Sequence, residues 1–181
     1  MDPINPPPVS LAEVKDQLSW AQSDDSQNSR LSRLACSASE QWEKDTQTIT
    51  TERSVTESLP AFPCSPEFRF YYRPVNLVTL VTYYDKAGSL VTMDSSSYSV
   101  DYPNGRIYFD SIPETESRWN AVSITYDAGS LAANVPAIAK QAILMQVDIQ
   151  EELRGLNPKD KDASINAYEN IVRRYERGSY P

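Results

Sequence analysis

The acidic side chains are the residues of this sequence with the clearest capacity for chemistry. Two pairs, Glu114 with Glu116 and Asp94 with Asp101, lie close together along the chain. Two carboxylates that face one another across a sugar linkage can act as the acid and base of glycoside hydrolysis. Nothing in the spacing of these pairs indicates that they converge, and acid-rich surface loops are much commoner. We therefore expect no enzymatic activity, with a carboxylate hydrolase as the alternative.

Other catalytic chemistries are limited by which residues are missing. The chain contains no histidine, which excludes Ser-His-Asp, Cys-His and HExxH sites. Cys36 and Cys64 belong to no CxxC or Cys/His cluster, so we expect buried free thiols rather than a disulfide or a metal site. No GxxxxGK[ST] or GxGxxG loop is present among only five glycines. The sequence therefore predicts no catalytic residue, no metal and no cofactor.

Length and composition favour a folded domain with irregular segments. The chain has 181 residues, of which 40% are hydrophobic, and it contains 13 prolines. That is enough for one packed domain with an appended arm. No apolar run approaches the ~20 residues that cross a bilayer, and the first residues lack the pattern of a signal peptide. We expect a soluble protein that is made in the cytoplasm and has no membrane partner.

The net charge of −8 and the sequence pI near 4.6 are opposite to the basic surface of a protein that grips phosphates. Residues 1–59 carry a net charge of −5, residues 60–127 carry −3, and residues 128–181 carry 0. A broad DNA-binding surface is therefore not expected. The C-terminal part of the chain is the least repulsive to an acidic partner.

The first part of the chain is predicted to be helical after a flexible proline-rich arm at residues 1–9, which contains Pro6-Pro7-Pro8. Ser10 and Glu13 fit a capping box, so a short helix is expected to begin there and to end near Trp20. A second helix is indicated by apolar residues at three- and four-residue intervals from Leu31 to Trp42. A Thr-rich extended stretch over residues 46–55 follows, ending at Leu59-Pro60.

Residues 62–127 have the alternation and turn signals of an all-β region, which we expect to form a small antiparallel sheet or barrel. Hairpin turns are predicted at residues 85–89 and at Pro103-Asn104-Gly105. The expected strands lie at residues 68–72, 75–84, 90–93, 98–102, 106–109 and 122–127. Most of the 11 tyrosines lie in or beside these strands. They are either ordinary sheet packing or part of a partner surface, such as that of a receptor- or glycan-binding virion protein.

A strand and a long helix meet near residue 130. The strand ends at Gly129, and Pro136 suits the first helical position, so a helix is predicted from Pro136 to Gly155. Its core stripe is expected to comprise Ile138, Ala142, Met145, Ile149 and Leu153.

Three further apolar residues of this helix, Ile143, Leu144 and Val147, are predicted to lie on the side of Lys140 and Glu151, where a single subunit would leave them exposed. A second packing surface is implied. It is either the β region of the same chain or a neighbouring subunit, and the three residues are our candidate subunit interface.

A last helix is expected to begin at Asn157-Pro158 and to end at Gly178. The predicted fold class is α+β, with a helical core and a small antiparallel β insertion. The core would comprise two N-terminal helices, one long helix after residue 135 and a C-terminal helix. The expected divisions are an arm at 1–9, a main domain at 10–155 with its β-rich region at about 62–127, and a helical arm at 156–181.

The order of these motifs is more specific than any one of them. Together they resemble the head-tail connector, or adaptor, proteins of tailed bacteriophages, over about residues 10–154. The resemblance rests on residues 10–15, the second helix through Trp42, Leu59-Pro60, residues 74–88, residues 98–101, and residues 125–129 followed by 135–143.

Members of this family are not enzymes. The resemblance implies a ring, commonly of twelve subunits, that lies beneath the portal in the neck of the virion and lets DNA pass through its lumen. A portal protein and a tail or head-completion protein are the implied partners. An acidic lumen would repel the DNA backbone and let it slide, and an extra apolar face would suit a ring contact.

The chain departs from the family pattern by its additional C-terminal helix. The segment 156–181 is either an arm that docks on the portal or a cover for the protein's own core. The candidate docking residues are Arg173, Arg174, Tyr175, Arg177 and Tyr180.

Overall fold

The chain divides into two compact units, which are described separately below. The computed structural model describes residues 7–130, 134–155 and 161–177. Glu52–Gly129 forms the β unit, and the flanking segments Asp2–Thr51 and Ser130–Tyr180 form the helical unit. The β-rich region is thus inserted in sequence between the two halves of the helical unit.

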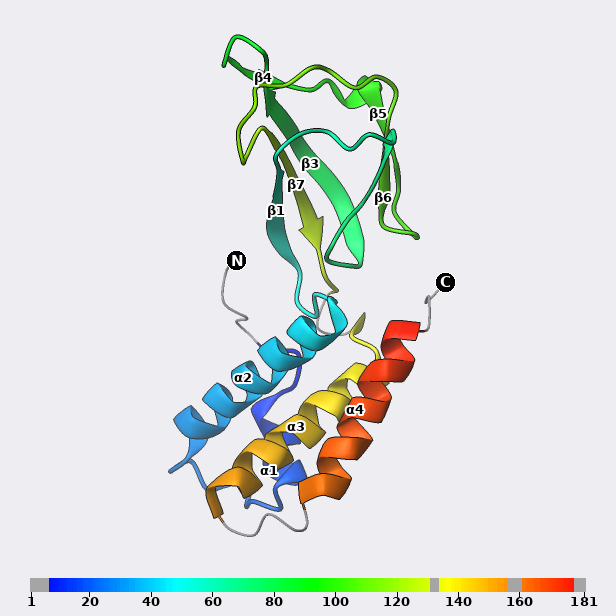
Figure 1. Cartoon of the computed structure of the whole chain (residues 1–181). Helices are drawn as coiled ribbons and strands as arrows, with labels where there is room; N and C mark the ends of the chain where they lie inside the picture. The colour runs from blue at the N-terminus through cyan, green and yellow to red at the C-terminus, as the bar shows by residue number, and fades with distance from the viewer. Residues whose placement is uncertain (1–6, 131–133, 156–160, 178–181) are drawn as a thin grey trace. The chain divides into compact units, whose positions relative to one another are not determined.

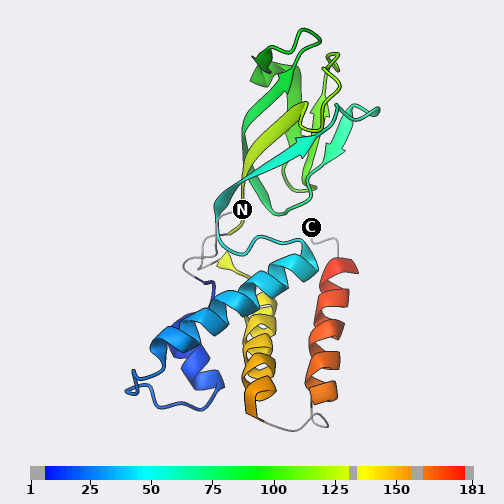
Figure 2. The ribbon, with the colours of Figure 1, turned by 60° about the vertical axis from the view of Figure 1, so that its left-hand side comes forward.

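The helical unit is built around one central helix. α3 (Ala137–Gly155) lies between α2 (Asn28–Thr46) and α4 (Lys161–Arg177) in both views (Figures 1 and 2). The short helix α1 (Leu11–Gln17) contacts both α2 and α3. α3 therefore has helical neighbours on several sides, and a single apolar stripe would not be enough to pack against all of them.

The start of α1 confirms the predicted capping box. The backbone N–H of Glu13 donates to the Ser10 hydroxyl at 3.2 Å, and the Ser10 N–H donates to the Glu13 carboxylate at 2.6 Å. The hydrogen bond from the Ser10 backbone, followed by weaker effects of the Ser10 hydroxyl and of Lys140, lowers the pKa of Glu13. The helix ends at Gln17, slightly before the predicted end near Trp20.

The core of the helical unit is closed by aromatic contacts between α2 and α4. Trp42 is fully buried, and its ring lies 6.4 Å from that of Tyr168 and 5.0 Å from that of Tyr175. Burial of one large apolar side chain typically stabilises a fold by about 1.5–3 kcal/mol. The C-terminal helix therefore covers the core of its own unit, as one of the two alternatives expected.

The expectation that Ile143 and Val147 would be exposed in a single subunit is wrong. Both are 0% exposed, and Leu144 packs partly buried against the same core. The reason is the central position of α3, whose second apolar side faces other helices of the same chain. Conversely Ile138, predicted to lie in the core, is 38% exposed.

The last part of the predicted flexible arm is packed. Pro8 is buried and Val9 is 1% exposed, as part of the helical core. The expectation of a flexible arm is therefore wrong for these two residues. Residues 1–6 lie outside the described part of the chain, as do Asn157-Pro158 and Gly178 at the predicted limits of the last helix.

The β unit is larger than the predicted small insertion, because it contains two antiparallel sheets with a core of their own. The four-stranded sheet has the order β1-β7-β3-β4, and the three-stranded sheet has the order β2-β6-β5 (Figure 1). The strands are β1 (Arg53–Leu59), β2 (Glu67–Arg69), β3 (Val75–Tyr84), β4 (Leu90–Thr92), β5 (Tyr98–Asp101), β6 (Arg106–Phe109) and β7 (Val122–Ala128), with the 3-10 helix η1 (Ser95–Ser97) before β5.

The hairpins confirm the turn signals of the sequence. β3 pairs with β4 and β5 pairs with β6, and Gly105 adopts a φ of 62° in the second turn, a conformation in which a side chain is disfavoured. The predicted strand over residues 68–72 is shorter than expected, since β2 ends at Arg69. Gly129, with a φ of 108°, ends β7 as predicted.

The core of the β unit joins side chains of both sheets. The ring of Phe62 lies 5.1 Å from that of Phe109 on β6 and 5.5 Å from that of Tyr83 on β3. Tyr126 on β7 is fully buried, and its hydroxyl donates to the Glu57 carboxylate on β1. This contact fixes a charged side chain of the edge strand β1 to the centre of the sheet.

Candidate interaction surfaces

The acidic pairs considered for catalysis each hold structural partners. Glu114 pairs with Lys86, and Glu116 lies 3.6 Å from Arg118. Asp94 accepts a hydrogen bond from the Ser96 N–H at 2.8 Å, which lowers the pKa of Asp94. Asp101 accepts from the Asn104 side chain at 2.8 Å. A general acid needs a raised pKa, so the environment of Asp94 is the opposite of what such a role requires.

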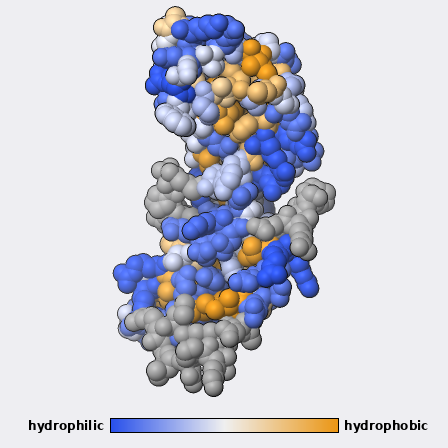
Figure 3. Space-filling model, viewed as in Figure 1, coloured by the Kyte–Doolittle hydropathy of each residue, from blue (hydrophilic) through white to orange (hydrophobic). Residues whose placement is uncertain are grey.

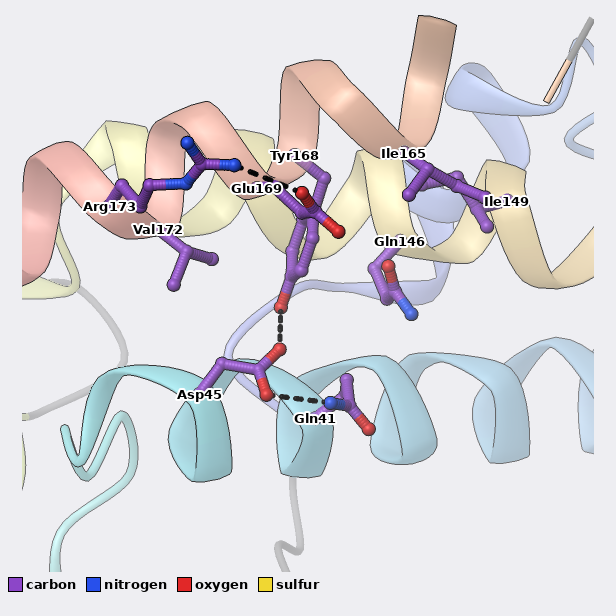
Figure 4. Close-up of a pocket in the computed structure, with 9 residues that line it drawn as sticks. All are labelled: Gln41, Asp45, Gln146, Ile149, Ile165, Tyr168, Glu169, Val172 and Arg173. Carbon is purple, nitrogen blue, oxygen red and sulfur yellow. Dashed lines mark hydrogen bonds and ion pairs between the residues drawn. The ribbon is translucent and has the colours of Figure 1, made fainter. Parts of the chain in front are cut away.

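A groove of about 550 Å³ lies between α2, α3 and α4 of the helical unit (Figure 4). Its apolar lining comes from Ile149 on α3 and from Ile165 and Val172 on α4. Figure 3 shows apolar residues on the surface between α2 and α4, surrounded by hydrophilic ones. The other lining residues are polar or charged: Gln41, Asp45, Gln146, Tyr168, Glu169 and Arg173.

The polar groups of the groove bond to one another, and one of these contacts joins two helices. The Tyr168 hydroxyl of α4 donates to Asp45 of α2 at 2.9 Å, and the Gln41 amide donates to the same carboxylate at 2.7 Å (Figure 4). Burial of the ring, reinforced by this hydrogen bond to Asp45, raises the pKa of Tyr168. Glu169 pairs with Arg173 at 3.2 Å.

These contacts occupy the polar groups of the groove with hydrogen bonds and ion pairs that hold the helices of this unit together. Asp45 bonds to the tyrosine and to Gln41, and Glu169 bonds to the arginine one turn away, so each carboxylate already has a partner. Among the residues that the structure describes, no group of three His, Cys, Asp or Glu side chains is arranged to hold a metal ion. In the sequence, Tyr168 lies three residues after Ile165 and four before Val172, a spacing that indicates an apolar helix face but does not reveal a hydrogen bond to Asp45.

The candidate docking residues on α4 do not form one exposed patch. Tyr175 packs against Trp42, whereas Arg173 and Arg174 are exposed. Arg177 is the last residue of α4, and its side chain lies outside what the structure describes, as does all of Tyr180. Tyr175 therefore has a role in the core, and docking through Arg173 and Arg174 stays a prediction.

Among the residues that the structure describes, most of the large hydrophobic side chains that are exposed belong to the β unit. Leu77 is 50% exposed and Leu80 is 43% exposed, and both lie on the outer face of the four-stranded sheet, opposite Asp127 and Thr125 of β7. Two irregularities in the β3 register, between Val75 and Leu77 and between Val78 and Leu80, turn these leucines outward. A simple alternation of the β3 sequence could not have revealed this.

The loop before β7 carries one almost fully exposed aromatic ring. Trp119 is 91% exposed, while the preceding residue Arg118 stacks over Tyr84 at 3.8 Å. The other exposed rings of the β unit are Tyr71 at 52% and Tyr102 at 38%. Tyr126, by contrast, is fully buried, so the tyrosines are divided between packing and exposed surface as the two alternatives allowed.

No helix in the described ranges 7–130, 134–155 and 161–177 combines the length and hydropathy needed to span a membrane. Cys36 is half-buried and Cys64 is exposed. The expectation that both cysteines would be buried is therefore wrong for Cys64.

The chain matches no known family description and no curated protein sequence. Its fold is nevertheless similar to chains in solved structures of gene transfer agent (GTA) particles. The neck of an empty GTA particle, computed with sixfold symmetry, contains a chain with a TM-score of 0.74 and 18% identity. The match covers 96% of this chain and 93% of that one.

Two further structures give the same result with the same coverage. The virion of the native gene transfer agent contains a chain with a TM-score of 0.69 and 17% identity. The neck of the native particle, computed with twelvefold symmetry, contains one with a TM-score of 0.65 and 22% identity. At these identities the likeness establishes a shared fold over nearly the full length of both chains.

Proposed function

We propose that this protein is a structural subunit of the neck of a phage-like particle. Many copies would form a closed ring, of twelve subunits in our proposal, that joins head to tail beneath the portal and lets DNA pass. The observation that carries the proposal is the fold likeness to chains of GTA neck structures over 96% of this chain. Those necks were computed with sixfold and twelvefold symmetry, which is the symmetry of a ring.

In this proposal the protein works by binding neighbouring subunits and the portal, and it catalyses no reaction. The carboxylates considered for catalysis have structural partners, and the net charge is −8. In a ring that surrounds DNA, an acidic surface repels the phosphate backbone and keeps it from adhering. The two units offer different surfaces for such contacts: exposed arginines on α4 of the helical unit, and exposed apolar side chains on the β unit.

Docking on the portal is assigned in this proposal to the exposed arginines of α4. Arg174 is exposed in the last turns of the helix, near the end with negative partial charge. A cluster of basic side chains on an otherwise acidic protein suits an acidic partner surface.

The test is size-exclusion chromatography with light scattering, applied to the full chain alone and mixed with the portal protein of the same particle. We expect a complex with the mass of the portal and a full ring. A chain that stays monomeric in the presence of the portal and is retained by immobilised glycans would contradict the proposal and support a receptor- or glycan-binding role.

Two charge reversals localise the docking site. Arg174→Glu is expected to weaken portal binding at least about tenfold, because it places a negative charge where a positive one is proposed to meet the portal. Arg33→Glu, at an exposed position on α2, is the matched control and should bind like the unchanged protein. Equal binding by both variants would remove α4 from the docking surface.

A further inference from the structure

We propose that neighbouring copies of this chain join edge to edge through the four-stranded sheet, with β1 of one subunit paired to β4 of the next. This inference rests on the ring proposed above and names the surfaces that would form it. The order β1-β7-β3-β4 leaves β1 and β4 as the two edges of the sheet (Figure 1). A strand edge is a template for pairing with another chain, because its backbone groups on that side lack partners.

The ladder determines which backbone groups of β1 face outward. The Gly129 N–H donates to the Pro74 carbonyl, and the Tyr84 N–H donates to the Ala121 carbonyl. In an antiparallel sheet, the N–H and C=O groups of one residue point to the same side of the strand, and successive residues alternate sides. The backbone groups of odd-numbered residues of β7 therefore bond to β3, and those of even-numbered residues bond to β1. The even-numbered residues of β7 lie opposite the odd-numbered residues of β1.

The remaining residues of β1, namely Ser54, Thr56 and Ser58, thus direct their N–H and C=O groups away from the sheet. All three are exposed. Within residues 7–130, 134–155 and 161–177, no backbone group pairs with them on that side. Their side chains are short hydroxyls, and β1 contains no proline or lysine, the residues that commonly protect an edge.

The hydrogen bonds of the β3–β4 hairpin determine which backbone groups of β4 face outward. The Met93 N–H donates to the Val81 carbonyl, and the Asp85 N–H donates to the Ser89 carbonyl. Odd-numbered residues of this hairpin therefore bond across it, which leaves the backbone groups of Leu90 and Thr92 facing outward. Leu90 is also 61% exposed, so a partner strand would cover an apolar side chain as well as satisfy backbone groups.

Strand direction favours a second copy as the occupant of the β1 edge. All neighbouring strands of the sheet are antiparallel, so the first and last strands of four also run in opposite directions. Subunits of a large ring are related by a small rotation, which places β4 of one copy antiparallel to β1 of the next. The contact joins two different surfaces, as closure of a ring requires.

The three-stranded sheet does not have this property. Its order is β2-β6-β5 and both pairings are antiparallel, so its two edge strands run in the same direction. A neighbour in the ring would meet it with parallel edge strands, and parallel pairing is slightly less stable per residue than antiparallel pairing.

Charge also suits contact between copies of this acidic protein. β4 has the sequence Leu90-Val91-Thr92, and the exposed face of β1 carries only hydroxyls. Two chains with a net charge of −8 repel one another over most of their surface. The residues of β1 and β4 that would face one another, Ser54, Thr56 and Ser58 against Leu90 and Thr92, carry no charge, so their side chains do not oppose the pairing.

The first test compares two substitutions at one position. Thr56→Pro removes the outward N–H of β1 and leaves the inward ladder intact, so we expect at least about a tenfold loss of ring assembly on the portal. Thr56→Val keeps the N–H and removes only the hydroxyl, which lies 3.0 Å from that of Thr125, and should assemble normally. Equal assembly by both variants would overturn the inference.

A second pair of variants tests the pairing without a proline, so that the result does not depend on the folding of Thr56→Pro. Leu90→Asp is expected to prevent assembly, because a charge would be placed at the paired edge. Leu80→Asp is the matched control: Leu80 is 43% exposed on the same sheet and lies opposite Thr125, but it belongs to the interior strand β3. If Leu90→Asp assembles as well as Leu80→Asp, the edge pairing is wrong.

Hydrogen exchange gives a direct readout on the full chain. The amides of Ser54, Thr56 and Ser58 should exchange rapidly in the free subunit and become at least about a hundredfold slower in the assembled ring. A ring in which these amides still exchange rapidly would overturn the edge pairing while leaving the ring proposal intact. Failure of the unchanged chain to form any ring with the portal would instead contradict the proposed function.

Discussion

The two units of the molecule differ in how many of their large apolar side chains are exposed. Of the eight large hydrophobic residues that are exposed in the described part of the chain, only Ile138 belongs to the helical unit. The other seven lie in the β unit: Tyr71, Leu77, Leu80, Leu90, Tyr102, Ile112 and Trp119. Among the described residues, the helical unit buries or partly buries its large apolar side chains with the exception of Ile138, whereas the β unit leaves seven of them exposed.

The difference separates stability from association. Trp42, Ile143 and Val147 of the helical unit are fully buried and contribute to folding. The exposed leucines of the β unit, Leu77, Leu80 and Leu90, leave between 43% and 61% of their surface exposed, so their contribution to folding is smaller than that of a fully buried side chain. Substitution of the buried core side chains should therefore reduce folding, whereas substitution at the exposed edges of the four-stranded sheet should reduce assembly and leave folding intact.

The largest expected effect comes from a charge in the helical core. Val147→Asp should destabilise the helical unit by at least about 4 kcal/mol, because an unpaired carboxylate would be buried among apolar side chains. Urea denaturation followed by circular dichroism measures the change. If the Val147→Asp variant is folded and stable and fails only in ring assembly, Val147 belongs to a subunit interface and not to the core of the helical unit.

A hydroxyl deletion in each unit gives an intermediate effect. Tyr126→Phe and Tyr168→Phe each remove a hydrogen bond to a carboxylate, from Glu57 and Asp45 respectively. Each should lower the free energy of unfolding by about 2 kcal/mol, as measured by chemical denaturation. If only one variant is destabilised, the hydrogen bond of the other tyrosine does not contribute to the stability of its unit.

The same tyrosines predict a loss of stability at alkaline pH. Burial, together with the hydrogen bond to a carboxylate, raises the pKa of both above the ordinary value of 10.0. In the unfolded chain these groups ionise near pH 10, whereas in the folded chain they keep the proton, so rising pH favours unfolding. The contribution of the two tyrosines to the free energy of unfolding should be constant below pH 9 and should fall above pH 10. The double Tyr→Phe variant should lose this dependence.

The smallest expected effect lies on the outer face of the β unit. Leu80→Ser should change the free energy of unfolding by no more than about 0.5 kcal/mol, since Leu80 is 43% exposed. Thermal unfolding measures this. A destabilisation comparable to that of Val147→Asp would mean that this face is part of the core of the β unit.

Local signals in the sequence were sufficient for most elements. The capping box of Ser10 and Glu13, the Asn104-Gly105 turn and the alternation of β7 each depend on residues close together in the chain, and each is present as predicted. Such features are determined by backbone geometry and local hydrogen bonds, which the sequence encodes directly.

Features that depend on distant partners could not be predicted. The burial of Ile143 and Val147 depends on the position of α3 between other helices, and periodicity identifies an apolar side without identifying what covers it. The outward turn of Leu77 and Leu80 depends on irregular pairing between β3 and β7. The open edges of the sheet follow from strand order, which no local pattern specifies.

The most direct test of the proposed function is a cryo-electron microscopy map of the neck of a phage-like particle assembled in the presence of this protein. We predict a closed ring of copies of this chain between head and tail, around the path of the DNA. A map in which the neck contains no copy of the chain, or in which copies are isolated from one another, would contradict the account.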